Sequence, residues 1–266
     1  MADSRKGSLE RGPLEKGSLK RPGSLPENWS QFQQSMLEGA ASPGSPTPSK
    51  VQPLTEELKR FYQADFGYME QNLSEARCLA IDIETTGLDS DKDKIVSVGL
   101  VEFDAKRIYL PTAKHWLVNP GELSDTSIVI HGITHSDVSS APRINSIMPE
   151  LLDAMSGRLC VVHYRAMERE FFRKLGFHLW SQPWLFPVID TFALEASCLN
   201  KSQRWFDRLL GRPLPSLRLP DARQRYNLPE YENHNALVDA IATAELLQAQ
   251  IQKWKLANRA VKELCL

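Results

Sequence analysis

The sequence predicts an α/β fold in which a mixed β-sheet is flanked by helices. Residues 77–118 hold three strand-like apolar segments separated by short polar turns, which is typical of an antiparallel meander. Further along the chain, shorter apolar segments alternate with helical patterns, and this alternation indicates strands added in parallel. A chain of 266 residues that is 42% hydrophobic can build one sizeable core and still carry appendages.

The strands of the predicted meander follow one another closely. We expect them at residues 77–85, 95–103 and 107–118. The second, "IVSVGLVEF", alternates along its length as a strand does. The polar segments "DSDKDK" and "DAK" are the turns that join the three strands.

Helices and short strands alternate through the second half of the chain. Apolar residues at helical spacing predict a helix over 144–155 that stops at Gly157, and Pro149 is tolerable there only near the first turn. A strand, a helix and another strand are then expected at 158–163, 167–175 and 186–190. The apolar pattern over 237–254 predicts a long amphipathic helix.

The first 53 residues differ in composition from the rest. Leu9, Leu14 and Leu19 mark a five-residue repeat that matches neither helix nor strand, and a Pro/Ser/Gly-rich stretch follows it. We expect residues 1–53 to form a disordered low-complexity leader, with a short amphipathic piece around 32–37 or a docking motif left open. The remaining regions are a helical lead-in at 54–76, the main domain at 77–254 and a short tail at 255–266.

Charge and composition exclude some classes of protein. A formal net charge of -1 argues against binding nucleic acid through a bulk basic field, so any phosphate must be met by local groups or metals. No apolar run is long enough for a membrane helix, and no membrane association is expected. The four cysteines lack CxxC spacing, which predicts reduced thiols and a cytoplasmic location.

Two carboxylates lie inside the first predicted strand, in "LAIDIETTGL". Alternate residues of a strand share a face, so Asp82 and Glu84 point the same way with Cα atoms roughly 6.5 Å apart. Burying two like charges without a partner is costly unless a cation lies between them. The stretch therefore predicts a metal site.

Three other segments compete to complete that site. One is "HYRAMEREFF", in which Glu168 falls on a helix directly after a strand end. Another is "HNALVD", where five helical positions separate His234 from Asp239 by roughly 140°, so His234 must reach in from before the helix. In the third, "DTFALE", Asp190 is expected to cap a helix that begins at Thr191.

The ordered set "DIETTGL", "HYRAMEREFF" and "HNALVD" resembles the three motifs of the DEDDh 3′-to-5′ exonucleases, the superfamily that contains the bacterial DNA polymerase III epsilon proofreading subunit. The segment "IHGIT" resembles the His-Gly loop of that family, and the resemblance covers residues 77–253. It implies a ribonuclease H-like fold, in agreement with the meander and the parallel strands expected above.

The resemblance also implies a mechanism that uses two Mg²⁺ or Mn²⁺ ions. Asp82 would bridge both ions, Glu84 and Asp239 would complete the site of the water-activating ion, and Glu168 would serve the second ion. His234 would take the proton of the attacking water. Products would be nucleoside 5′-monophosphates.

The expected substrate is a single-stranded nucleic acid with a free 3′ end, DNA preferred, in repair, proofreading-like processing or turnover. By resemblance, the terminal nucleotide would contact Thr85, Leu88, His131 and Met167. An RNA-trimming exonuclease of the same chemistry is an alternative. Association with a polymerase is left open, since only a short segment follows the last predicted helix.

The second motif departs from the family pattern. The family usually has Asp preceded by an aromatic residue and an Asn after the His, whereas this chain has Glu168 after Met167, and Tyr164 in place of the Asn. An inactive relative that binds nucleic acid or a partner is therefore a second alternative. We expect an active site, because one extra methylene can be absorbed at the less tightly held ion.

Overall fold

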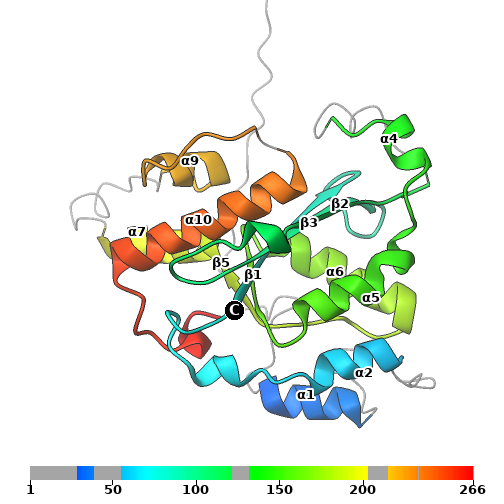
Figure 1. The fold of residues 1–266 in the computed structure, drawn as a ribbon, viewed down its shortest axis with the longest axis horizontal. Helices are drawn as coiled ribbons and strands as arrows, with labels where there is room; N and C mark the ends of the chain where they lie inside the picture. Colours follow the sequence, from blue (N-terminus) through cyan, green and yellow to red (C-terminus); the bar gives the residue numbers. More distant parts are fainter. Residues whose placement is uncertain (1–28, 39–54, 122–131, 203–214, 233, 266) are drawn as a thin grey trace, which may run out of the picture.

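A five-stranded mixed sheet forms the centre of the molecule (Figure 1). The computed structural model describes residues 29–38, 55–121, 132–202, 215–232 and 234–265. The strands are β1 (Cys78–Thr85), β2 (Ile95–Phe103), β3 (Lys114–Leu117), β4 (Leu159–Val162) and β5 (Val188–Asp190). Their spatial order is β3-β2-β1-β4-β5.

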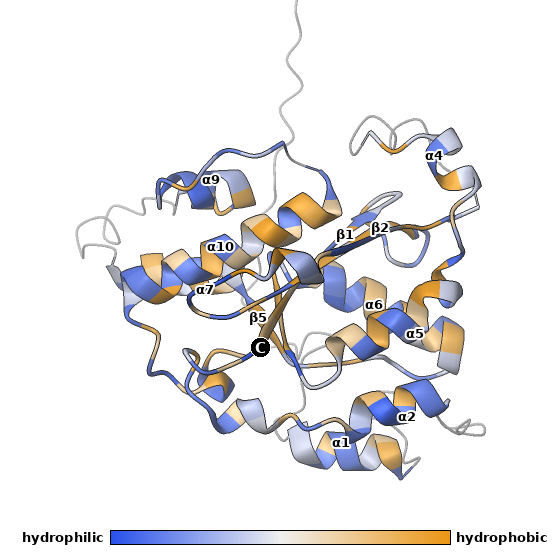
Figure 2. Cartoon of the chain, in the orientation of Figure 1, coloured by the Kyte–Doolittle hydropathy of each residue, from blue (hydrophilic) through white to orange (hydrophobic). Residues whose placement is uncertain are grey.

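The pairing directions confirm the predicted meander and parallel additions. β1 pairs antiparallel with β2 and β2 with β3, whereas β4 lies parallel to both β1 and β5. β1 and β2 are apolar along most of their length (Figure 2) and almost entirely buried. β3 is shorter than predicted, because Leu110–Thr112 form a 3₁₀ turn, η2, before it.

Helices cover both faces of this sheet. Those in the described residues are α1 (Trp29–Leu37), α2 (Glu56–Gln63), α4 (His135–Ser139), α5 (Ile144–Met155), α6 (Ala166–Trp180), α7 (Thr191–Ser202), α9 (Leu219–Gln224) and α10 (Ala236–Trp254). α7, α9 and α10 lie on one side and α5 and α6 on the other (Figure 1). No helix in the part of the chain that the structure describes is long and apolar enough to cross a membrane.

α5 has the predicted bounds but tolerates Pro149 in its interior, not in its first turn. A proline there lacks the N–H that would bond to the carbonyl of Asn145. Both residues are exposed, so water can hydrate the freed carbonyl. The predicted restriction of Pro149 to the first turn is therefore wrong, because solvent on this face lowers the cost of the missing bond.

A folded segment interrupts the predicted disordered leader. α1 packs on α2 and buries Trp29, Phe32 and Met36. The Trp29 ring meets Phe66 at a centroid distance of 5.3 Å, and Gln33 Nε2 donates to the Ala64 carbonyl at 3.1 Å. Residues 29–37 are therefore helical inside the expected disordered leader, where a short amphipathic piece is left open at 32–37, because three large apolar side chains there share one helical face. The rest of the leader lies outside the described residues.

The C-terminal segment after α10 is hydrogen-bonded to the lead-in before β1. The Leu73 N–H donates to the Arg259 carbonyl at 2.9 Å, and the Val261 N–H donates to the Gln71 carbonyl at 3.0 Å. Val261 begins the 3₁₀ turn η3 (Val261–Glu263), is fully buried, and lies against η1 (Gly67–Glu70). The segment before β1 and the segment after α10 are therefore held together by backbone hydrogen bonds.

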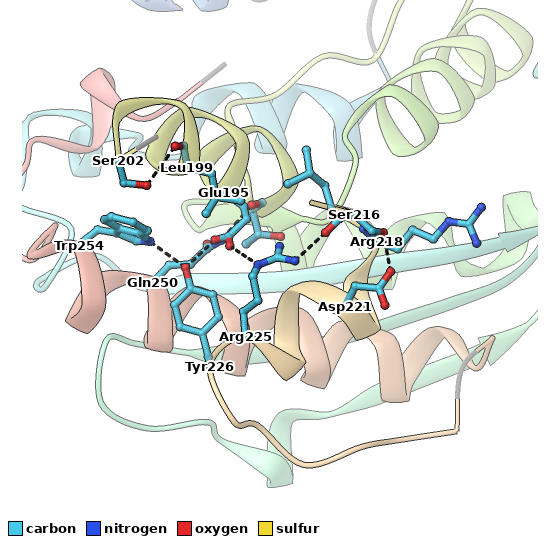
Figure 3. A network of polar contacts seen from close by, with 12 residues as sticks. Glu195, Leu199, Ser202, Ser216, Arg218, Asp221, Arg225, Tyr226, Gln250 and Trp254 are labelled. Carbon is cyan, nitrogen blue, oxygen red and sulfur yellow. Dashed lines mark hydrogen bonds and ion pairs between the residues drawn. The ribbon is translucent and has the colours of Figure 1, made fainter. Parts of the chain in front are cut away.

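A buried carboxylate joins α7 to α10 and to the segment after α9 (Figure 3). Glu195 accepts hydrogen bonds from Arg225 Nε at 3.0 Å, Tyr226 Oη at 2.5 Å and Gln250 Nε2 at 3.0 Å. Tyr226 Oη in turn accepts from Trp254 Nε1 at 2.7 Å. Because the charge of Glu195 is met by a guanidinium and two further donors, this acid fixes helices and has no unmet demand for a cation.

Replacing Trp29 with alanine should destabilise the protein, because it removes a large buried ring from the interface of α1 and α2. We expect the free energy of unfolding to fall by about 3 kcal/mol, near the low end for buried aromatic side chains since α1 can detach locally. Chemical denaturation measures this loss. Ser30→Ala, on the exposed side of the same helix, is the matched control. Equal stability of the two variants would show that α1 does not dock.

Candidate active site

Three carboxylates from two distant segments converge at the C-terminal half of β1. Asp82, Glu84 and Asp239 each offer an oxygen, and these oxygens lie within 4.8 Å of one another. Asp82 and Glu84 project from the same face of β1, as their spacing predicted, and Asp239 comes from the first turn of α10. Oxygen ligands at this separation suit a hard divalent cation.

The start of α10 reaches these carboxylates because β2 carries a glycine at the point of contact. Gly99 is the register partner of Asp82, and a Cβ at Gly99 would lie 2.2 Å from the Ala236 carbonyl carbon and the Leu237 nitrogen. Only a residue without a side chain lets the helix lie this close. Asn235 then caps α10 by accepting from the Leu237 and Val238 N–H groups at 3.1 and 3.2 Å, which places Asp239 in the first turn.

The proximity of these acids changes their protonation. Burial, followed by the charges of Glu168, Asp239 and Glu84, raises the pKa of Asp82 well above its usual range. Burial and then the Asp239 charge raise the pKa of Glu84 to about 7. Burial also raises the pKa of Asp239. All three shifts reflect the cost of burying a carboxylate, to which like charges add at Asp82 and Glu84, and a bound cation would offset that cost.

Glu168 lies beside this cluster and is not one of its three members. It occupies the first turn of α6 with 3% of its surface exposed, and burial raises the pKa of its carboxyl well above the usual range. Its Oε2 atom has no hydrogen-bond partner among the described residues. Such an oxygen is costly to bury unless it is protonated or binds a cation. The structure thus brings Glu168 next to Asp82 without completing a four-carboxylate ligand set.

His234 precedes α10, as the motif spacing required. Its backbone adopts a left-handed conformation with φ of 70°, and its N–H donates to Asp239 Oδ2 at 2.9 Å. This bond holds the Asp239 carboxylate from the side of the chain that leads into the helix. The His234 side chain is exposed, so its imidazole is open to solvent beside the carboxylates.

The residues expected to contact a terminal nucleotide are only partly placed. Leu88 is 84% exposed in the turn after β1, which is unusual for a large apolar side chain. Thr85 uses its hydroxyl to donate to the Gly87 carbonyl at 2.6 Å, and Met167 is half-buried at the start of α6. His131 lies outside the described residues.

Asp190 does more than the helix capping predicted for it. Its Oδ1 accepts from the Phe192 N–H at 3.0 Å, as a cap of α7. The same carboxylate accepts from the Tyr164 and Arg165 N–H groups, at 3.0 and 3.2 Å, in the turn between β4 and α6. Sequence spacing held no signal for this second role, because the two turns meet only when β4 and β5 pair.

Comparisons with known proteins agree with this geometry. Residues 79–247 match the sequence model of the RNase T family, described as Exonuclease. A DNA polymerase III PolC-type protein of Thermotoga maritima is 28% identical over 187 residues, which is 70% of this chain and 13% of the relative. A DNA polymerase III subunit epsilon-like protein of Rhodobacter capsulatus is 30% identical over 178 residues, 66% of this chain and 24% of the relative. The chain thus spans less than a quarter of the length of both relatives.

Solved structures share the fold. Exonuclease X, in complex with 5′ overhanging duplex DNA, has a TM-score of 0.52 at 22% identity, and the match covers 70% of this chain and 98% of that one. The nuclease domain of 3′hExo, a DEDDh family member bound to rAMP, has a TM-score of 0.53 at 16% identity, covering 69% and 94%. The family match extends over more than half of the chain, and its first and third motifs meet in space. The chain therefore belongs to the RNase T exonuclease family.

Proposed function

We propose that this chain is a metal-dependent 3′-to-5′ exonuclease that releases nucleoside 5′-monophosphates from single-stranded ends. The observation that carries the proposal is the convergence of Asp82, Glu84 and Asp239, whose oxygens lie within 4.8 Å of one another. Among the described residues, none of the three forms an ion pair with a lysine or arginine. Residues 77–254 would form the catalytic domain.

The ligand chemistry favours Mg²⁺ or Mn²⁺, because every candidate ligand is a carboxylate oxygen. Asp82, Glu84 and Asp239 would hold one ion, and Asp82 with Glu168 would hold a second. Bound ions would neutralise charge on the scissile phosphate and lower the pKa of an attacking water. The unpartnered Oε2 of Glu168 supports its role, since a cation would satisfy it.

Proton transfer is assigned to His234. The backbone N–H of His234 donates to Asp239 Oδ2, its imidazole is exposed to solvent, and histidine is the side chain used most often as a general base. The hydrogen bond from the His234 backbone N–H to Asp239 holds the residue that carries the base beside the proposed metal ligand. A neutral imidazole nitrogen would accept the proton of the water that attacks the phosphorus.

The terminal nucleotide would lie against Thr85, Leu88, His131 and Met167. The exposure of Leu88 supports this, because an apolar side chain at 84% exposure gains from covering a base or sugar. DNA is the preferred substrate, in repair or turnover, since the sequence relatives are named as DNA polymerase III proteins. An RNA substrate is the second candidate, favoured by the rAMP complex of a structural neighbour.

The cysteines bear on the location of the protein in the cell. All four cysteines are free thiols, three of them buried, which fits the reducing cytoplasm.

The direct test is degradation of 5′-labelled single-stranded DNA and RNA with Mg²⁺ or Mn²⁺. We expect a one-nucleotide ladder for the wild type, and a loss of at least about 10²-fold in rate for Asp82→Ala, because the shared ligand is removed. The variant should melt no lower than the wild type without metal, since repulsion is relieved. Asp153→Ala, an exposed acid on α5, is the matched control. No ladder from the wild type on either strand would refute the proposal.

Glu168 distinguishes an active enzyme from an inactive relative. Glu168→Gln should lower kcat by about 10²-fold, because it removes a charge from a site whose work is electrostatic. Glu168→Asp keeps the charge and should remain within about tenfold of wild type. Glu170→Gln, a residue paired with Arg173 on the same helix, is the control and should change little. A fully active Gln variant would show that Glu168 binds no ion.

The metal-free protein should become less stable as the pH rises through neutrality. The pKa of Glu84 is raised from 4.5 to about 7 in the folded state, so its contribution to stability is complete below about pH 4.5 and is lost as the pH passes about 7. In EDTA, Glu84→Gln should therefore melt above the wild type at about pH 8 and converge with it at about pH 5. If the melting temperatures of the two proteins differ by the same amount at about pH 5 and at about pH 8, the raised pKa of Glu84 is contradicted.

A further inference from the structure

Two aromatic side chains meet beside the candidate active site, at the ends of neighbouring strands. Tyr164 follows β4, and Phe192 is the second residue of α7, which begins directly after β5. Their ring centroids are 5.2 Å apart at an interplanar angle of 61°. Tyr164 is 48% exposed, and Phe192 is half-buried behind it. The pair therefore presents one supported aromatic surface to solvent.

The sheet places this surface on a defined side of the carboxylates. β1, β4 and β5 are adjacent and parallel, so their C-terminal ends lie along one edge in steps of about 5 Å. Leu88 belongs to the turn toward β2, on the other side of β1. The carboxylates of β1 thus lie between Leu88 and Tyr164, about two strand spacings or less from the aromatic pair.

The position of Tyr164 is imposed by its backbone. Its φ of 77° is left-handed, a conformation that a bulky side chain adopts only when its surroundings hold it there. Asp190 does so by accepting from the N–H groups of Tyr164, Arg165 and Phe192. One buried carboxylate therefore orients both members of the pair. Asparagine, the usual residue of the resembled family at this position, adopts a left-handed backbone more readily than tyrosine. Tyrosine therefore costs conformational free energy here, and a contact made by its ring would offset that cost.

We propose that Tyr164, supported by Phe192, stacks on the base of the penultimate nucleotide, the one 5′ to the scissile phosphate. The stacking proposal rests on one part of the proposed function, namely that the terminal nucleotide lies on the Leu88 side of the carboxylates. A single-stranded nucleic acid whose terminal nucleotide lies near Leu88 crosses the carboxylates with its scissile phosphate. Its penultimate base then reaches Tyr164 and Phe192. Stacking on an aromatic face is tolerant of sequence, so the pair adds affinity for any strand and selects against substrates of a single nucleotide.

Binding measurements separate this contact from catalysis. The whole 266-residue chain carrying Asp82→Ala is expected to cut at least about 10²-fold more slowly than the wild type, so fluorescence anisotropy can measure the Kd of a labelled four-nucleotide single strand. We expect Tyr164→Asn in that background to raise Kd by about 5- to 150-fold. Removing only the base of the penultimate nucleotide should raise Kd similarly. The two changes together should raise it no further, because each removes one half of the same contact.

Three controls decide the outcome. Tyr164→Phe should restore tight binding, since it keeps the ring and drops the hydroxyl. Tyr109→Asn alters another exposed tyrosine, near the N-terminal end of β1, and should leave Kd unchanged. Removing the base farthest from the 3′ end should add its effect to that of Tyr164→Asn. Three results would each overturn the proposal. The effects of Tyr164→Asn and of removing the penultimate base on Kd could be additive, Tyr164→Asn could be coupled to a different base, or Tyr164→Phe could fail to restore binding.

A nuclease assay on the same chain keeps the two hypotheses apart. If the wild type makes no product but Tyr164 and the penultimate base remain coupled in binding, the proposed exonuclease fails and the stacking contact stands. If the wild type makes a ladder and Tyr164→Asn binds and cuts as the wild type does, the stacking contact fails and the exonuclease stands.

Discussion

The mutual repulsion of Asp82, Glu84 and Asp239 is the constraint on which the rest of the site depends. Burial raises the pKa of each of these carboxyls, and neighbouring acids raise those of Asp82 and Glu84 further, so folding must offset the cost of bringing the three together. The pairing of β1 with β2 holds the first two acids. The third arrives because Gly99 lets the backbone of α10 touch β2. The site therefore lowers the stability of the metal-free protein, and a bound cation would restore it by offsetting the repulsion.

Two buried acids elsewhere in the molecule have protein hydrogen-bond donors for both carboxylate oxygens. Asp190 accepts three backbone N–H groups, and Glu195 accepts from an arginine, a tyrosine and a glutamine. Both bind protein donors and organise turns or helices. Glu168 is as deeply buried yet leaves Oε2 without a donor among the described residues. The contrast separates acids that hold the fold together from one that is open to a metal.

Most elements followed from local pattern. Alternation in β2 and the helical spacing in α5 and α10 placed these elements within a residue or two, because burial against one core imposes the period of each. Prediction failed where the environment overrode the pattern. Pro149 lies inside α5 because solvent hydrates the freed carbonyl, and α1 folds because its apolar face finds the aromatic residues of α2 and of the lead-in.

The sequence by itself determined the fold class, the identity of the clustered acids and the order of the motifs. Those depend on residue type and spacing along one chain. Only the tertiary structure decided that Glu168 lies outside the three-carboxylate cluster, that Asp190 holds the Tyr164 turn, and that Gly99 admits α10. Each of these is a contact between segments far apart in the chain. Such distances are set by strand pairing and by how closely backbones can approach, and local spacing carries no record of either.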